Sequence, residues 1–129
     1  MPILLQKFIS RSDLQANKHV MYAFGDNLEE AGFGGQAKEM RGEPNALGIP
    51  TKASPYMFLS DVAHYKLVTH RYNLIFEQIE VAMKARKLLV WPLDGIGTGL
   101  ADLKNKAPMC WAYLEAKRHS LFEGRLLTE

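Results

Sequence analysis

Three polar residues whose side chains could take part in catalysis follow two short apolar runs. Asp26 and Asn27 come soon after the run at residues 19–24, and Asp94 follows the run at residues 87–93. A carboxylate at the end of a strand can act as a base toward water or a ribose hydroxyl. We therefore take Asp26 and Asp94 as candidate catalytic residues. The alternative is that the two aspartates only satisfy loop amides through their side chains.

Each of these positions lies beside a glycine-rich segment, at residues 32–35 and 95–99. Glycine lets the backbone approach an anion closely, so that successive N–H groups can surround a phosphate. The alternative is that the glycines only make tight turns between strands and helices. The candidate ligand-binding residues are the glycines, their neighbours and two residues after Pro50: Gly25, Gly32, Phe33, Gly34, Gly35, Gln36, Thr51, Lys52, Gly95, Ile96, Gly97, Thr98, Gly99 and Leu100.

Side chains within and near these segments suggest how a nucleotide would be held. Phe33 is an aromatic residue inside a glycine loop, so it either stacks on a base or ribose or forms a lid. Arg41 and Lys52 either neutralise phosphate charge or are solvated surface residues. Neither loop has the third glycine of the dinucleotide fingerprint or the Gly-Lys-Ser/Thr end of a P-loop. The sequence therefore argues against ordinary hydride transfer and triphosphate hydrolysis.

Alternating strands and helices must position the two loops. Compact apolar runs predict strands at residues 3–9, 19–24, 45–49 and 87–93. Capping residues and apolar spacing predict helices at residues 10–17, 36–41, 60–83 and 105–118. This order predicts a three-layer α/β fold with a mainly parallel sheet and helices on both faces. Both loops would then lie beyond the carboxyl ends of strands, where ligands bind in such sheets.

Bulk composition limits the partners. The chain has 129 residues, which is typical of one domain, so we expect residues 1–129 to form a single domain. The net charge of +2 indicates neither nucleic acid nor a membrane as a partner. The sequence leaves the oligomeric state open. We expect neither a cofactor nor a metal, because the four histidines have no ligand spacing and Cys110 is a lone cysteine inside a predicted helix. The absence of a leader pattern and of a long apolar run predicts a cytoplasmic protein.

The two glycine segments also resemble those of macro domains, which bind ADP-ribose. Residues 26–37 are similar to the segment in which a strand ends in asparagine and a glycine-rich loop leads into a helix. Residues 90–100 resemble the strand, proline and Ser/Thr-Gly loop that wraps the diphosphate. Small macro-like proteins of bacteria and their viruses share Phe-Gly-Asp-Asn, Gly-Gly-Gln-Ala, Glu-Pro-Asn-Ala and Asp-Gly-Ile-Gly-Thr-Gly-Leu-Ala, a likeness that covers residues 13–108.

The resemblance implies a macro-like fold that binds an ADP-ribose-like nucleotide. Asn27 would lie near the distal ribose and is the third candidate catalytic residue, and Gly97, Thr98 and Gly99 would lie near the diphosphate. The chain has no clear equivalent of the acidic residue that contacts adenine in this family, and Asp13 is the substitute that it offers. The resemblance to poly-ADP-ribose hydrolases at Gln36 adds hydrolysis of an ADP-ribosyl derivative as an option. Two alternatives stay open, namely a nucleotide sensor or sequestering protein without catalysis, and an interaction protein whose loops are purely structural.

Overall fold

The computed structural model describes residues 2–127 and contains ten regular elements. In chain order they are β1 (Ile3–Gln6), α1 (Arg11–Ala16), β2 (Met21–Asn27), α2 (Ala37–Met40), β3 (Ala46–Ser54), β4 (Met57–Phe58), α3 (Asp61–Lys84), β5 (Leu89–Pro92), α4 (Leu103–Lys106) and α5 (Pro108–Phe122). Each predicted strand and helix has a counterpart, and β4 is an additional strand that the sequence pattern did not indicate.

The strands form one sheet in the order β1-β5-β2-β3-β4. The pairs β1/β5, β5/β2 and β2/β3 are parallel, and only β4 runs antiparallel to its neighbour. The prediction of an α/β fold with a mainly parallel sheet is therefore correct. Because β1, β5, β2 and β3 run in the same direction, their carboxyl ends meet at one edge of the sheet.

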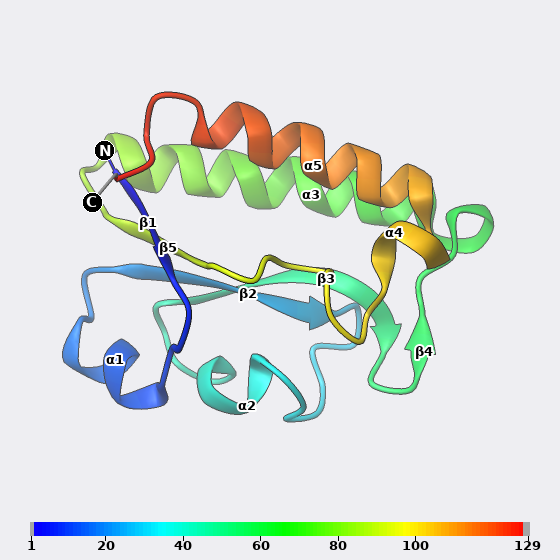
Figure 1. Cartoon of the computed structure of the whole chain (residues 1–129), viewed down its shortest axis with the longest axis horizontal. Helices are drawn as coiled ribbons and strands as arrows, with labels where there is room; N and C mark the ends of the chain where they lie inside the picture. Colours follow the sequence, from blue (N-terminus) through cyan, green and yellow to red (C-terminus); the bar gives the residue numbers. More distant parts are fainter. Residues whose placement is uncertain (1, 128–129) are drawn as a thin grey trace.

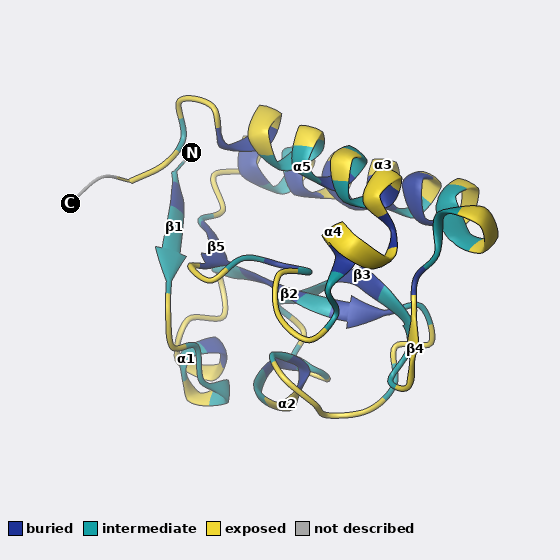
Figure 2. Cartoon of the chain, turned by 45° about the vertical axis from the view of Figure 1, so that its right-hand side comes forward, coloured by how far each residue is buried: buried dark blue, intermediate teal, exposed yellow. Residues whose placement is uncertain are grey.

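Helices cover both faces of this sheet, with α3 and α5 on one side and α1 and α2 on the other (Figure 1). Two separate apolar clusters fill the layers between sheet and helices. The larger one surrounds Trp91, whose ring packs edge-on against Phe122 with ring centres 5.2 Å apart. Buried positions accordingly follow the inward faces of the helices and the strands, as Figure 2 shows.

Two strands extend further than the sequence pattern indicates. β2 continues past the predicted end at residue 24 to Asn27, because its parallel pairing with β3 continues to Lys52 across a register shift. β3 runs through Pro50 to Ser54 instead of ending before the proline. β4 pairs with β3 only from Lys52 on, so Pro50 occupies an edge position where the missing N–H is tolerated.

The predicted last helix is in fact two helices, α4 and α5, with Ala107 between them. Pro108 explains the break, because proline cannot continue a helix from the preceding turn but fits the first position of a new one. The Asp61 carboxylate accepts hydrogen bonds from the free N–H groups of Met109 at 2.8 Å and Cys110 at 2.9 Å. The first residue of α3 thus caps α5.

The contribution of the Asp61 cap to the stability of the fold should depend on pH. Partial burial alone would raise the pKa of Asp61, but the hydrogen bonds from Met109 and Cys110 outweigh it and lower the pKa below its ordinary value. A carboxylate with a lowered pKa stabilises the fold above its unfolded-state pKa of about 4 and loses that effect as the pH falls through the folded-state value.

We expect Asp61→Ala to lower the free energy of unfolding by about 1 kcal/mol at pH 7, as for other lost helix caps. The difference from the wild type should shrink in urea titrations as the pH falls below about 4. A difference that stayed constant down to pH 3 would contradict the proposed cap.

None of the helices between residues 2 and 127 has the length and apolar character that a membrane crossing requires.

Candidate functional site

The candidate site lies where β2 and β5 separate. These neighbours pair only at Met21 with Leu89 and Tyr22 with Val90. The chain that leaves β2 enters α2 on one face of the sheet, whereas the chain that leaves β5 enters α4 and α5 on the other face (Figure 1). In parallel sheets, a crevice opens at such a point and ligands commonly occupy it.

A cleft of about 540 Å³ occupies this crevice, and both glycine loops line it. Gly35 and Gly97 therefore lie on the same cavity, as predicted for a shared site. Most of the other predicted residues also line the cleft: Gly25, Asp26, Asn27, Gly32, Phe33, Gly34, Gln36, Thr51, Lys52, Asp94, Gly95, Thr98, Gly99 and Leu100.

Both loops have main-chain N–H groups without a protein acceptor. Within residues 2–127, this holds for the N–H groups of residues 33–35 and of residues 97–101. Gly35 and Gly97 adopt φ values of +55° and +82°, in the left-handed region that glycine tolerates best. Free N–H groups in such bends make concave binding sites for anions.

Gln36 joins the two loops. Its side-chain Oε1 accepts the N–H of Gly25 at 2.7 Å, and its Nε2 donates to the carbonyl of Gly95 at 3.1 Å. The carboxamide offers the same donor and acceptor as a peptide group, so it takes the place of main-chain pairing between β2 and β5 where the strands have separated. Gln36 was predicted to bind ligand, but its carboxamide is already committed to holding the cleft walls together.

Asp26 is bound in an ion pair and does not fit the role of a base. Its Oδ1 accepts Nη2 of Arg41 at 2.5 Å and the N–H of Asn27 at 2.7 Å, and its Oδ2 accepts Nη1 of Arg41 at 3.2 Å. Only 6% of the Asp26 side chain is exposed. A Cβ at Gly48 would lie 2.5 Å from Oδ2, so the neighbouring strand needs glycine here. Asp26 therefore has a structural role, as the alternative held, but its main partner is Arg41 rather than a loop amide.

Asn27 shapes the first loop through its side chain. Its Nδ2 donates to the carbonyl of Ala31 at 2.8 Å, and its Oδ1 accepts the N–H groups of Glu29 at 3.0 Å and Ala31 at 3.3 Å. Asn27 lines the cleft but is buried. These contacts leave one amide hydrogen as its remaining donor toward a ligand, because a carboxamide has two.

Asp94 differs from Asp26 because it is exposed at the cleft wall and its carboxylate makes no hydrogen bond or ion pair within residues 2–127. Two hydroxyls in the cleft are engaged with main-chain carbonyls: Thr98 donates to Asp94 and Thr51 to Asp26. Of the three candidate catalytic residues, Asp94 is thus the one whose side chain has no partner within residues 2–127.

Two sequence-based assignments need correction. Ile96 was predicted to contact ligand, but it is only 3% exposed and belongs to the larger apolar cluster, because its side chain points into the core while its glycine neighbours face the cleft. Asp13 is not part of the cleft lining. Its carboxylate instead accepts the N–H of Ser10 at 2.9 Å and the side chain of Gln6 at 3.0 Å, as part of the cap of α1.

Exposed apolar side chains from three segments surround the mouth of the cleft. Phe33 is 65% exposed, Tyr56 97% and Leu100 95%, and all three belong to the lining. Exposed apolar groups around a pocket are typical of ligand-binding sites. Tyr56 was missed in the sequence because nothing local indicates that the turn between β3 and β4 faces the glycine loops.

The remaining reactive groups lie outside the cleft. Cys110 is buried, as expected, and burial together with its contact to Asp61 raises the pKa of the thiol to about 12. The thiol therefore stays protonated at neutral pH. Between residues 2 and 127, no cluster of His, Cys, Asp or Glu side chains is arranged to hold a metal ion.

A family of unknown function (DUF7831) matches residues 4–117. Neither a curated protein nor a solved structure matches the chain.

Proposed function

The chain belongs to the family of unknown function DUF7831, and we propose that its cleft binds an ADP-ribose-like nucleotide. The observation that carries this proposal is the pair of bends with free N–H groups on one cavity at the β2/β5 crevice. Such groups suit the oxygens of a diphosphate, which accept several hydrogen bonds at once.

The rest of the cleft suits the other parts of such a ligand. A volume of about 540 Å³ is in the range for small-molecule and cofactor sites. Phe33 and Tyr56 provide aromatic surfaces at the mouth for a base or a ribose. We propose that Lys52 supplies positive charge to the phosphates, because Arg41 is committed to Asp26.

The resemblance of both loops to those of macro domains supports the choice of ADP-ribose among nucleotides, and on this basis we propose a macro-like fold. Asn27 would contact the distal ribose through its remaining amide hydrogen, while the loop at residues 97–99 would wrap the diphosphate. The contacts of Asn27 and Gln36 favour binding over catalysis as the main role, since both side chains build the walls.

Hydrolysis of an ADP-ribosyl derivative is a second candidate function, favoured by one observation. The free carboxylate of Asp94 lies at the cleft wall and can orient a water molecule. If the pure protein turns over ADP-ribosyl substrates, Asp94→Asn should reduce the rate at least tenfold and leave ADP-ribose binding nearly unchanged. If no turnover is detected, the protein is a binder.

Titration calorimetry with ADP-ribose, NAD, AMP and inorganic diphosphate tests the binding proposal. We expect ADP-ribose to bind more tightly than AMP, because AMP lacks the diphosphate. In Gly99→Val, the added side chain meets no protein atom within 4 Å of its Cβ, so the fold should persist while the loop is obstructed. We expect the affinity for ADP-ribose to fall at least tenfold, which corresponds to about 1.4 kcal/mol.

Ala63→Val, which adds a similar group on the exposed surface of α3, serves as the control. Wild-type protein that binds none of these compounds at millimolar concentration would refute the proposal and favour an interaction protein with structural loops. Equal affinities in Gly99→Val and the wild type would place the ligand elsewhere.

A further inference from the structure

Two lysines from separate segments lie against one aromatic ring beside the cleft. Nζ of Lys52 in β3 is 5.4 Å from the ring centre of Phe58 in β4, and Nζ of Lys106 in α4 is 4.6 Å from it. Lys52 and Phe58 are cross-strand partners, and α4 lies next to β4 (Figure 1). We call these three residues the Lys52–Phe58–Lys106 cluster.

Neither ammonium group has a carboxylate partner within residues 2–127. Lys52 donates to the carbonyl of Pro55 at 2.8 Å, which uses one of its three N–H groups. The nearest acidic residue along α4, Asp102, instead accepts the side chain of Asn105 at 2.7 Å. The face of an aromatic ring attracts both cations, but it leaves their positive charges without a counter-ion.

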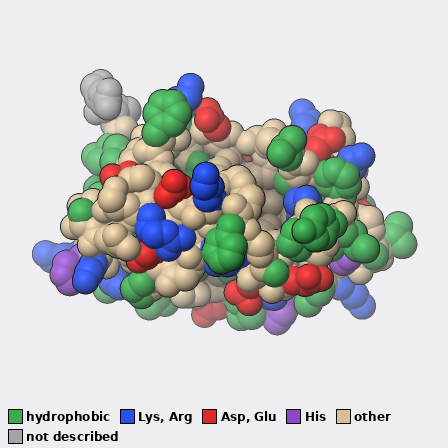
Figure 3. Space-filling view, turned by 90° about the horizontal axis from the view of Figure 1, so that it is seen from below, with side chains coloured by type: hydrophobic (Ala, Val, Ile, Leu, Met, Phe, Trp, Pro, Cys, Tyr) green, Lys and Arg blue, Asp and Glu red, His purple; other side chains and the backbone are tan. Residues whose placement is uncertain are grey.

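The cluster is continuous with the cleft. Lys52 belongs to the cleft lining, as does Tyr56, which follows it in the turn before β4. Figure 3 shows hydrophobic side chains gathered, with Lys and Arg among them, on the right-hand part of the surface, the side on which β4 lies in Figure 1. A ligand that leaves the cleft past Tyr56 thus meets positive charge.

From this arrangement we propose that the Lys52–Phe58–Lys106 cluster is a second anion subsite, which binds phosphate groups that the ligand carries beyond the diphosphate. The natural ligand is then an ADP-ribose-like nucleotide that carries further phosphate groups beyond its diphosphate. The identity of the nucleotide rests on the proposed function, whereas the anion subsite does not. Lys106 would be a specificity residue, because it lies outside the cleft and contacts only the extended ligand.

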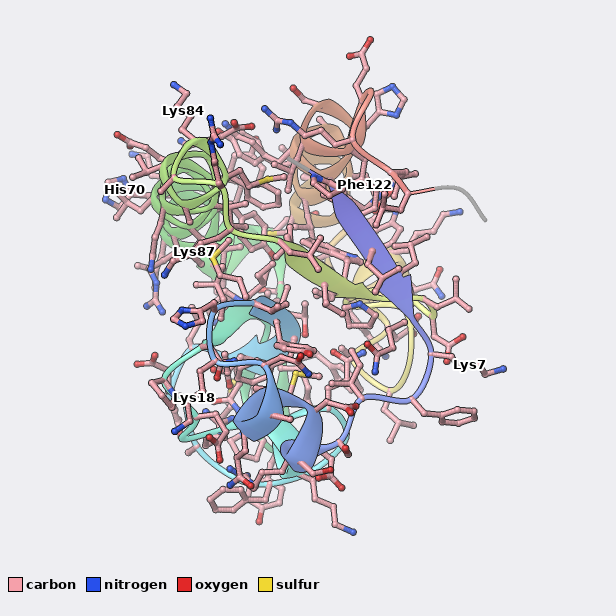
Figure 4. All side chains as sticks on the ribbon, turned by 90° about the vertical axis from the view of Figure 1, so that its left-hand side faces the viewer. Lys7, Lys18, His70, Lys84, Lys87 and Phe122 are labelled. Carbon is pink, nitrogen blue, oxygen red and sulfur yellow. The ribbon has the colours of Figure 1, made fainter. Side chains whose placement is uncertain are left out.

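Lys7 and Lys117 also lie over aromatic rings, 5.8 Å from the ring centres of Phe8 and Tyr113, but each ring holds a single lysine and neither lines the cleft. Lys18, Lys84 and Lys87 project outward at the opposite end of the molecule, as Figure 4 shows. Lys104 lies on the same short helix as Lys106 and is exposed, but Lys106 is the residue of α4 whose ammonium group lies over Phe58. Lys104 is therefore the matched control for charge without the subsite.

The test is titration calorimetry with inorganic diphosphate, a short linear polyphosphate and ADP-ribose, on the wild type, Lys106→Gln, Lys104→Gln and Phe58→Leu. We expect polyphosphate to bind the wild type more tightly than diphosphate, and Lys106→Gln to weaken polyphosphate binding about tenfold, as for the loss of one charged hydrogen bond. Phe58→Leu should weaken it by a smaller factor. Lys104→Gln should change it less than twofold, and ADP-ribose should bind Lys106→Gln as it binds the wild type.

Equal effects of Lys106→Gln and Lys104→Gln, or no advantage of polyphosphate over diphosphate, would overturn the subsite. Tight ADP-ribose binding alongside such a result would leave the proposed function standing. Conversely, no ADP-ribose binding with a Lys106-dependent polyphosphate affinity would refute the nucleotide and keep the subsite. A single-stranded oligonucleotide in the same assay distinguishes the source of the phosphates, since tighter binding than polyphosphate indicates a phosphodiester chain.

Discussion

Replacing Arg41 with methionine is expected to lower the free energy of unfolding by about 3–5 kcal/mol, the range for removing one partner of a buried ion pair. The change leaves the Asp26 carboxylate buried at 6% side-chain exposure with the Asn27 N–H as its remaining partner. It also removes the hydrogen bonds that Arg41 donates to the carbonyls of Gly32 at 2.7 Å and Ala31 at 3.2 Å. Arg41 therefore connects α2, the first glycine loop and the end of β2.

Chemical denaturation in urea at pH 7 measures this loss. Arg118→Met is the control, because its ion pair with Glu115 is partly exposed within α5 and should contribute less than about 1 kcal/mol. If both variants lost similar amounts, the Asp26–Arg41 pair would not have the structural role inferred here. Because the pair also supports the cleft, ligand binding by Arg41→Met should weaken together with its stability.

The second large effect is expected for Gln36→Ala. This variant leaves the N–H of Gly25 and the carbonyl of Gly95 without their partner, at a cost of about 1–3 kcal/mol of stability. The larger consequence concerns binding, because the two loops are no longer held at the spacing that a diphosphate requires. We expect calorimetry to show at least a tenfold loss of affinity for ADP-ribose.

Gln36→Glu separates positioning from a general loss of stability. Glutamate keeps an acceptor for Gly25 but has no donor for Gly95, so its affinity should lie between those of the wild type and Gln36→Ala. Gln78→Ala, on the exposed surface of α3, is the control and should bind as the wild type does. If Gln36→Ala bound ADP-ribose with wild-type affinity, the loops would not depend on this residue for their spacing.

Much of the scaffold follows from local sequence. The predicted helices at residues 10–17 and 60–83 begin at capping serines, and the side chains of Ser10 and Ser60 accept N–H groups in the first turns of α1 and α3. One error occurs where the sheet overrides the local signal, because β3 continues through Pro50 at an edge position that tolerates proline. The other error overlooked a local signal, since Pro108 itself marks the start of a separate helix.

The positions of the glycine loops were thus determined by the sequence alone, because apolar runs followed by glycines specify strand ends and tight turns by short-range rules. Tertiary structure decided which polar groups remain available in the cleft. Asp26 is paired with Arg41, and Gln36 reaches Gly95, 59 positions away along the chain. The ion pair depends on the packing of α2 against β2, and the Gln36 contact on the separation of β2 from β5. Both are long-range arrangements, and no local pattern of residue types encodes them.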